Sequence, residues 1–148
     1  MPVWTCQVIK TDEMDDAGQC VLLVDDDLAV RRSLKLLLQA RGYSVHDFGS
    51  GVELLAELAR APCRCLITDY SMPSMDGLTL LGRLRASGWS APAILITGCY
   101  QKGLEKRALE AGFSAIIEKP LTDEKLLDVL AQCLCGPVPP QAGSPRAL

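Results

Sequence analysis

The sequence lacks a basic excess and any long apolar run, and each shortage excludes a class of protein. Lys and Arg total 15 against 18 Asp and Glu in 148 residues, so a predominantly basic nucleic-acid surface is not expected. No stretch approaches the roughly 18 apolar residues of a membrane-spanning helix, and residues 1–19 lack the apolar core of a signal peptide. We therefore expect a cytoplasmic domain without membrane contact or direct nucleic-acid binding.

Histidine is nearly absent, which argues against a zinc site among the cysteines. The chain has seven Cys but one His, His46, which lies far from both close cysteine pairs in the sequence. Structural zinc sites usually show Cys-x-x-Cys spacing, whereas the pairs here are Cys-x-Cys, at 63/65 and 133/135. The favoured interpretation of the thiols is that they are small buried hydrophobic groups in a reducing compartment.

What the sequence does contain is an alternation of short apolar runs and amphipathic stretches. Four of the runs are nearly continuous, as in parallel strands buried on both faces, while 43–48 alternates as an edge strand would. The pattern predicts strands over 21–25, 43–48, 63–69, 93–98 and 115–119, and helices over 28–41, 51–60, 78–86, 103–111 and 123–135. Five strand-helix units predict an α/β domain with a doubly wound, three-layer sandwich.

The ends of the helices carry recognisable capping residues. We expect Asp27 to cap the first helix, Ser50 and Glu53 to form a capping box, and Thr122 to cap the last helix. On the first helix, Arg31 lies with the other basic residues mostly away from the apolar stripe.

The length leaves room for one ordinary domain and no second full one. We divide the chain into an N-terminal extension over 1–19, one domain over 20–135, and a flexible Pro/Gly-rich tail over 136–148. The tail cannot form a helix-turn-helix. An output domain is therefore not expected, although a Pro-rich tail also resembles an interdomain linker.

Polar residues follow the predicted strands, where ligands bind in open parallel sheets. Asp25 and Asp26 end the first strand and Asp69 the third, while Thr97 and Lys119 end the fourth and fifth. Clustered carboxylates repel one another, and Mg2+ with oxygen ligands relieves that repulsion. A metal-held carboxylate can attack a phosphoryl group whose oxygens a hydroxyl and an ammonium stabilise.

At these residues the chain resembles the receiver domain of two-component response regulators. The resemblance covers about residues 20–135, is closest to FixJ-type regulators and related hybrid sensor kinases, and rests on VLLVDDD (21–27), LITDYSMPSMDG (66–77), ILITG (94–98) and IIEKP (116–120). It implies a flavodoxin-like (βα)5 fold with a parallel five-stranded sheet of order 2-1-3-4-5.

The resemblance also implies a role for each site residue. Asp69 is the expected phosphoacceptor. Asp26 ligates Mg2+ directly, Asp25 does so mainly through water, and the backbone carbonyl of Ser71 adds another oxygen. The donor is the phosphohistidine of a sensor histidine kinase or phosphotransfer protein. The expected role is thus phosphorelay signal transduction, in which the chain catalyses only its own phosphorylation and dephosphorylation; homodimer formation stays open.

Thr97 and Lys119 are implied to bind phosphoryl oxygens, and the Lys119-Pro120 peptide to be cis. In the family, a Tyr or Phe three residues before the lysine couples the threonine to the output face, and this chain has Ile116 there. Packing around Ile116 would then carry the coupling. Ser71 and Cys99 hold the positions that set acyl-phosphate lifetime, and neither offers a carboxylate or amide to orient water, so we expect slow self-dephosphorylation.

The loop after the third strand contains Gly77, which supplies a backbone position free to take a positive φ just before a helix. Two alternatives remain open at this stage. The chain could be the receiver portion of a FixJ-type transcription factor without its DNA-binding domain. It could also be a haloacid-dehalogenase-like phosphatase with Asp25 as nucleophile, which would leave Asp69 unexplained.

Overall fold

The fold is known from a computed structural model that describes residues 20–57, 64–98 and 101–135. All strand pairs are parallel, and the sheet has the order β2-β1-β3-β4-β5 that the resemblance implied. The strands are β1 (Cys20–Val24), β2 (Ser44–Phe48), β3 (Cys65–Asp69), β4 (Ala93–Thr97) and β5 (Ala115–Glu118). The predicted α/β class and strand order are therefore confirmed.

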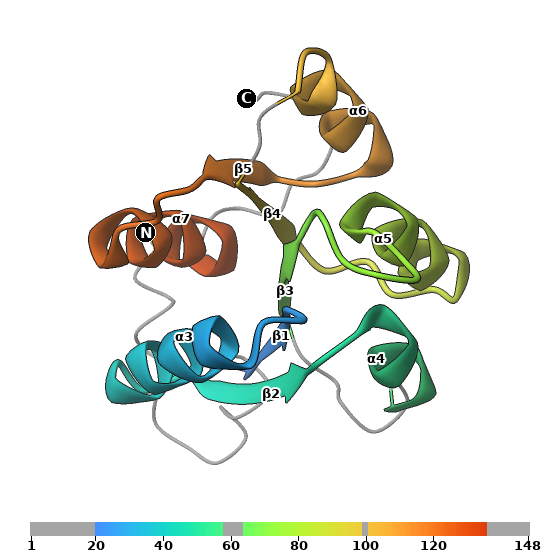
Figure 1. Ribbon diagram of the computed structural model, residues 1–148. Helices are drawn as coiled ribbons and strands as arrows, with labels where there is room; N and C mark the ends of the chain where they lie inside the picture. Colours follow the sequence, from blue (N-terminus) through green and yellow to red (C-terminus); the bar gives the residue numbers. More distant parts are fainter. Residues whose placement is uncertain (1–19, 58–63, 99–100, 136–148) are drawn as a thin grey trace.

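Helices cover both faces of this sheet, with α3 and α7 on one face and α4, α5 and α6 on the other (Figure 1). Their bounds are α3 (Leu28–Ala40), α4 (Gly51–Glu57), α5 (Gly77–Ala86), α6 (Leu104–Ala111) and α7 (Asp123–Cys135). The last three residues of the predicted helix 51–60 lie outside the described residues. So do the extension 1–19, Cys99 and the tail 136–148.

Two apolar layers hold the sandwich together. Every residue of β1, β3 and β4 is buried, which explains why these runs are continuous and not alternating. Leu22 and Leu66 pack under α4, α5 and α6, while Val21 and Ile67 pack under α3 and α7. The edge strand β2 is partly exposed.

The helix caps follow the sequence with one exception. The Asp27 carboxylate accepts from the N–H groups of Ala29 and Val30, and the Lys125 N–H donates to the Thr122 hydroxyl. At α4 the Glu53 N–H donates to the Ser50 hydroxyl at 3.2 Å. The Glu53 carboxylate, however, accepts from the N–H of Gly49, the residue before Ser50, and not from the N–H of Ser50 itself. The reciprocal half of the expected capping box is therefore shifted by one residue.

The thiol interpretation holds for only some of the described cysteines. Cys65 is a buried free thiol on β3 and Cys133 a half-buried one on α7, as small core residues would be. Cys20 is instead disulfide-bonded, so the expectation of reduced thiols throughout is wrong. In the described ranges, no helix is long and apolar enough to cross a membrane.

Candidate functional site

Three carboxylates meet at the carboxyl edge of the sheet, as the strand ends predicted. β1 and β3 are hydrogen-bonded neighbours, so Asp25 and Asp26 after β1 lie beside Asp69 at the end of β3. One carboxylate oxygen from each of the three lies within 4.8 Å of the others. Asp25 is 3% exposed and Asp69 9% exposed. Oxygen donors gathered so closely suit a hard divalent cation such as Mg2+.

Burial dominates the electrostatics of these carboxylates. Desolvation raises the pKa of Asp25, although the hydrogen bond from the Asp27 N–H and the charge of Lys119 oppose it. Desolvation likewise raises the pKa of Asp69, with Lys119 lowering it and Asp25 adding to the rise. The folded protein thus holds two carboxylates in a setting that disfavours their negative charge.

Lys119 and Thr97 lie at the same edge, at the ends of β5 and β4. The Lys119 ammonium nitrogen is 3.7 Å from Oδ1 of Asp69. The backbone N–H of Lys119 donates to the Thr97 carbonyl at 2.8 Å, and Thr97 itself is 1% exposed. The Lys119-Pro120 peptide is cis, as expected. The edge therefore collects carboxylates, an ammonium and a hydroxyl-bearing residue.

Gly77 serves the site in a different way from the one expected. Its φ is not positive; Ser74 is the residue in this loop with a positive φ, of 65°. A Cβ at Gly77 would instead lie 2.7 Å from the Asp69 carbonyl oxygen and 2.8 Å from Cδ1 of Leu95. Glycine is needed here because α5 begins directly against the end of β3.

Two further residues implied by the resemblance lie near this edge. Ser71 is exposed and follows Asp69 by two residues. Ile116 pairs in register with Leu95 of β4, and its half-buried side chain packs against the apolar layer under α5 and α6. Ile116 is thus placed between the sheet and the helices of one face.

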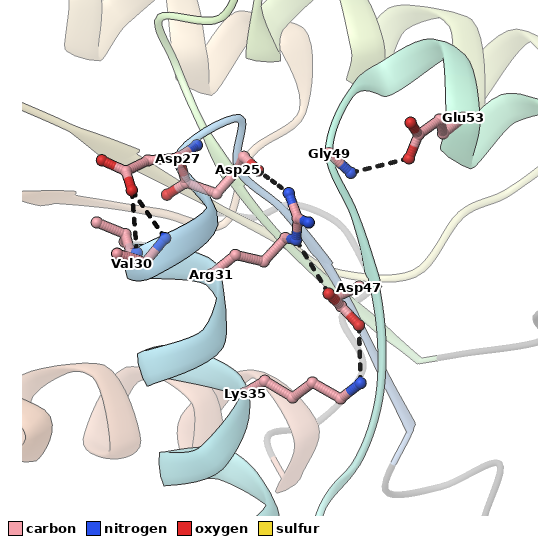
Figure 2. A network of polar contacts seen from close by, with 9 residues as sticks. Asp25, Asp27, Val30, Arg31, Lys35, Asp47, Gly49 and Glu53 are labelled. Atoms are coloured by element: carbon pink, nitrogen blue, oxygen red, sulfur yellow. Dashed lines mark hydrogen bonds and ion pairs between the residues drawn. The ribbon is translucent and has the colours of Figure 1, made fainter.

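A network of charged side chains next to Asp25 was not predicted from the sequence. Figure 2 shows this network. Nη1 of Arg31 donates to the Asp25 carbonyl at 2.9 Å, and its Nε contacts the Asp47 carboxylate at 3.0 Å. The Arg31 side chain is only 17% exposed, so its position away from the apolar stripe does not leave it in solvent. The available signal was Asp47 itself, an acidic residue in the same alternation as Tyr43 and Val45, which pack toward α3.

Desolvation of Asp47 acts to raise its pKa, but hydrogen bonds from Lys35 and Arg31 outweigh that burial and lower the pKa overall. The Lys35 ammonium lies 2.9 Å from the second carboxylate oxygen. Asp47 is therefore held as a carboxylate between two cations on α3.

A groove of about 390 Å3 opens beside the site, between α3 and the segment that joins β5 to α7. Its lining is mainly apolar and includes the site residue Lys119 and the following Pro120. The groove is thus lined by α3, by the segment that begins at Lys119 at the carboxyl edge of the sheet, and by the start of α7.

Comparisons with known proteins agree with this architecture. The family model of the response regulator receiver domain matches residues 21–131. Response regulator protein TodT of Pseudomonas putida is 32% identical over 133 residues, which cover 90% of this chain and 59% of TodT. Transcriptional regulatory protein FixJ of Bradyrhizobium diazoefficiens is 31% identical over 77% of this chain and 56% of FixJ.

Among solved structures, a CheY-like response regulator receiver domain protein from Methanospirillum hungatei matches with a TM-score of 0.74 at 29% identity. The match covers 78% of this chain and 93% of that one. The similarity to FixJ agrees with the resemblance that the motifs suggested. The chain spans well under two thirds of the length of TodT and of FixJ.

Proposed function

The chain belongs to the response regulator receiver domain family, and from this premise we propose that it accepts a phosphoryl group on Asp69 in a Mg2+-dependent reaction. The observation that carries the proposal is the meeting of Asp25, Asp26 and Asp69 within 4.8 Å, with the Lys119 ammonium 3.7 Å from Asp69. Such a set suits phosphoryl transfer better than a structural role, because buried like charges are costly without a cation.

The donor chemistry of the cluster fits Mg2+, which prefers carboxylate and carbonyl oxygens. Asp25, Asp26 and Asp69 would hold the ion, together with the backbone carbonyl of Ser71. When bound, the ion supplies positive charge for the oxygens of the transferring phosphoryl group.

The chain's own residues would carry the transfer. A carboxylate oxygen of Asp69 attacks the phosphorus of a phosphohistidine, the new P–O bond forms, and the P–N bond breaks with its electron pair left on the imidazole nitrogen. Lys119 pairs with one phosphoryl oxygen, and the Thr97 hydroxyl donates to another. Since the group ends on the chain's own side chain, the chain is a phosphoryl acceptor and not an enzyme that turns over other molecules.

The groove beside Lys119 supports a protein partner as donor. A helix that carries a phosphohistidine must bring that residue to the carboxyl edge of the sheet, and the apolar groove between α3 and the β5–α7 segment ends there. We therefore propose a sensor histidine kinase or a phosphotransfer protein as donor, docked over this groove. A phosphotransfer profile against candidate kinases tests this partner.

The phosphoacceptor is tested with the small donor acetyl phosphate and Mg2+. We expect an acid-labile phosphoryl group on wild type, trapped by borohydride reduction and located at Asp69 by peptide mass spectrometry. EDTA and Asp69→Asn should each abolish it, whereas Asp128→Asn, at an exposed aspartate of α7, should not. Label at Asp25 would contradict the proposal and favour a haloacid-dehalogenase-like phosphatase.

A further inference from the structure

We propose that Arg31 is a positioning residue for the magnesium site, because it fixes the peptide that joins Asp25 to Asp26. The inference rests on the proposed function, since it concerns how the chain holds the ion that phosphorylation requires. Arg31 lies on α3, and its guanidinium lies between the Asp25 carbonyl and the Asp47 carboxylate (Figure 2).

The contact that carries the inference is the hydrogen bond from Nη1 of Arg31 to the carbonyl oxygen of Asp25, at 2.9 Å. That oxygen belongs to the peptide between the two aspartates, and a peptide unit is planar. Fixing the oxygen therefore fixes the orientation of the plane and the position from which the Asp26 side chain starts. Asp26 is exposed, so its side chain gains little from packing.

Two other hydrogen bonds hold the same turn, but neither is made by the carbonyl or the N–H of that peptide plane. The Asp25 N–H donates to the Phe48 carbonyl at 3.2 Å, and the Asp27 N–H donates to Oδ1 of Asp25 at 2.9 Å. The first anchors the chain before the plane and the second the chain after it. Arg31 supplies the bond to the plane itself.

The guanidinium is itself held from two sides. Its Nε lies 3.0 Å from Oδ2 of Asp47 on β2, and Lys35 holds the other oxygen of that carboxylate at 2.9 Å. A guanidinium is a rigid, planar donor set, so an anchor at Nε also sets the direction of Nη1. The network thus connects the turn after β1 to both α3 and β2.

Gly49 leaves the space that this arrangement needs. A Cβ at position 49 would lie 3.0 Å from Nη1 of Arg31, and the φ of Gly49 is not in the left-handed region. Alanine there is therefore compatible with the backbone but crowds the guanidinium. This provides a way to displace Arg31 without changing any charge.

If Arg31 acts only through its charge, its removal should have the opposite effect on Mg2+ affinity from the one expected if it positions the ligands. This difference makes the inference testable. Removing a cation near a dication site should tighten Mg2+ binding by Coulomb's law. Removing a group that orients the ligands should weaken it, and such supporting partners are typically worth roughly 10- to 100-fold in metal affinity. A weaker site after loss of Arg31 cannot be explained by its charge.

The experiment measures Mg2+ dissociation constants of the full chain by isothermal titration calorimetry. We expect Arg31→Met and Gly49→Ala to weaken binding, the first by roughly tenfold. The matched control is Arg32→Met, which removes the same charge from the adjacent, exposed residue of α3 and should leave the affinity unchanged or slightly tighter. Urea unfolding of each variant records stability separately.

A kinetic readout separates positioning from general damage. With acetyl phosphate as donor, Arg31→Met should raise the Mg2+ concentration needed for half the maximal phosphorylation rate, while excess Mg2+ restores that rate. A variant that is merely destabilised would lose active protein at all Mg2+ concentrations. Arg31→Lys should recover little, because an ammonium cannot hold Asp47 and the Asp25 carbonyl in one rigid geometry.

The inference is overturned if folded Arg31→Met binds Mg2+ as wild type does, or if Arg32→Met weakens binding equally. Should Arg31→Met fail to fold, unchanged affinity in Gly49→Ala would overturn it instead. Failure of the proposed function has a different signature: wild type itself would show no Mg2+ binding and no phosphorylation of Asp69.

Discussion

At the residue scale, the buried carboxylates that suit Mg2+ binding lower the stability of the metal-free fold. Burial raises the pKa values of Asp25 and Asp69, so folding favours their protonated forms. The unfavourable contribution to stability is absent below the unfolded pKa of 3.8, grows as pH rises through the raised folded values, and is fully present above them. At neutral pH the metal-free site therefore destabilises the fold that carries it.

This effect predicts that Asp69→Asn stabilises the metal-free protein at pH 7, because the amide carries no charge to desolvate. Thermal unfolding in EDTA should show a higher Tm for the variant at pH 7, with the gain shrinking as pH approaches 3.8. Asp128→Asn, at an exposed position, is the matched control and should not shift the Tm. An unchanged or lower Tm for Asp69→Asn at pH 7 would show that burial is not the dominant influence.

Adding Mg2+ should reverse the order of stability, so that wild type becomes more stable than Asp69→Asn. Ligand at a hundred times its dissociation constant stabilises a folded protein by about 2.7 kcal/mol, and wild type should gain stability of that order on titration with Mg2+. Asp69→Asn lacks one charged ligand of the cluster and should gain less. Urea unfolding at matched ionic strength measures both, with NaCl in place of MgCl2 to correct for screening.

We also expect single residues to set the lifetime of the proposed acyl phosphate. Ser71 lies two residues after the phosphoacceptor and carries no carboxylate or amide to orient an attacking water. We expect slow phosphate release from wild type, and faster release from Ser71→Asn. A time course after removal of acetyl phosphate measures it, and a wild-type lifetime of seconds would contradict the prediction.

At the scale of helices and strands, most of what the sequence predicts follows from local chemistry. Apolar runs and periodicity locate the strands and helices, and side chains such as those of Asp27 and Thr122 cap the nearest turn. The site is predictable for the same reason, since parallel strands bring their carboxyl ends to one edge. Each of these signals needs only neighbours in the sequence or the strand order.

The two misses around the site involve contacts between elements. Arg31 meets Asp47 across 16 residues, so helical periodicity alone classes it with the solvated basic residues. Gly77 is explained by its approach to the Asp69 carbonyl and to Leu95, and not by its own backbone conformation. Nothing local in the sequence distinguishes a glycine needed for space from one needed for a turn.

The start of α5 provides a test of that distinction. Gly77→Ala places a Cβ 2.7 Å from the Asp69 carbonyl, and overpacking of this kind typically costs about 1–3 kcal/mol. The variant should be less stable and slower in phosphorylation, because the carbonyl that must move belongs to the phosphoacceptor. Urea unfolding and acetyl phosphate kinetics measure the two effects.

Gly82, in the same helix, is the matched control. It is exposed, and a Cβ there would have no atom within 4 Å. Alanine in an exposed helix interior stabilises by up to about 1 kcal/mol relative to glycine. Gly82→Ala should therefore raise stability without changing phosphorylation, and equal losses in both variants would contradict the close-approach explanation.

At the scale of the whole molecule, the site lies at the edge of a sheet whose two faces are covered by different helices. Lys119 and the groove belong to the face of α3 and α7, whereas Ile116 packs toward the layer under α5 and α6. Under the proposed function, the phosphodonor approaches from the face of α3 and α7, and the conformational response occurs on the face of α5 and α6. Thr97, at the end of β4 between these faces, is the residue we expect to link phosphorylation to the response.

Thr97→Ala should therefore separate the two events. Asp69 and the metal ligands are untouched, so the variant should still be phosphorylated by acetyl phosphate, while the hydroxyl that follows the phosphoryl group is gone. In wild type, phosphorylation should change amide hydrogen exchange in α6 and around Ile116, because it shifts a two-state equilibrium of that face. In phosphorylated Thr97→Ala the exchange pattern should stay that of the unmodified protein, and Thr97→Ser, which retains the hydroxyl, should respond. A full response in Thr97→Ala would mean that packing around Ile116 senses the phosphoryl group without the threonine.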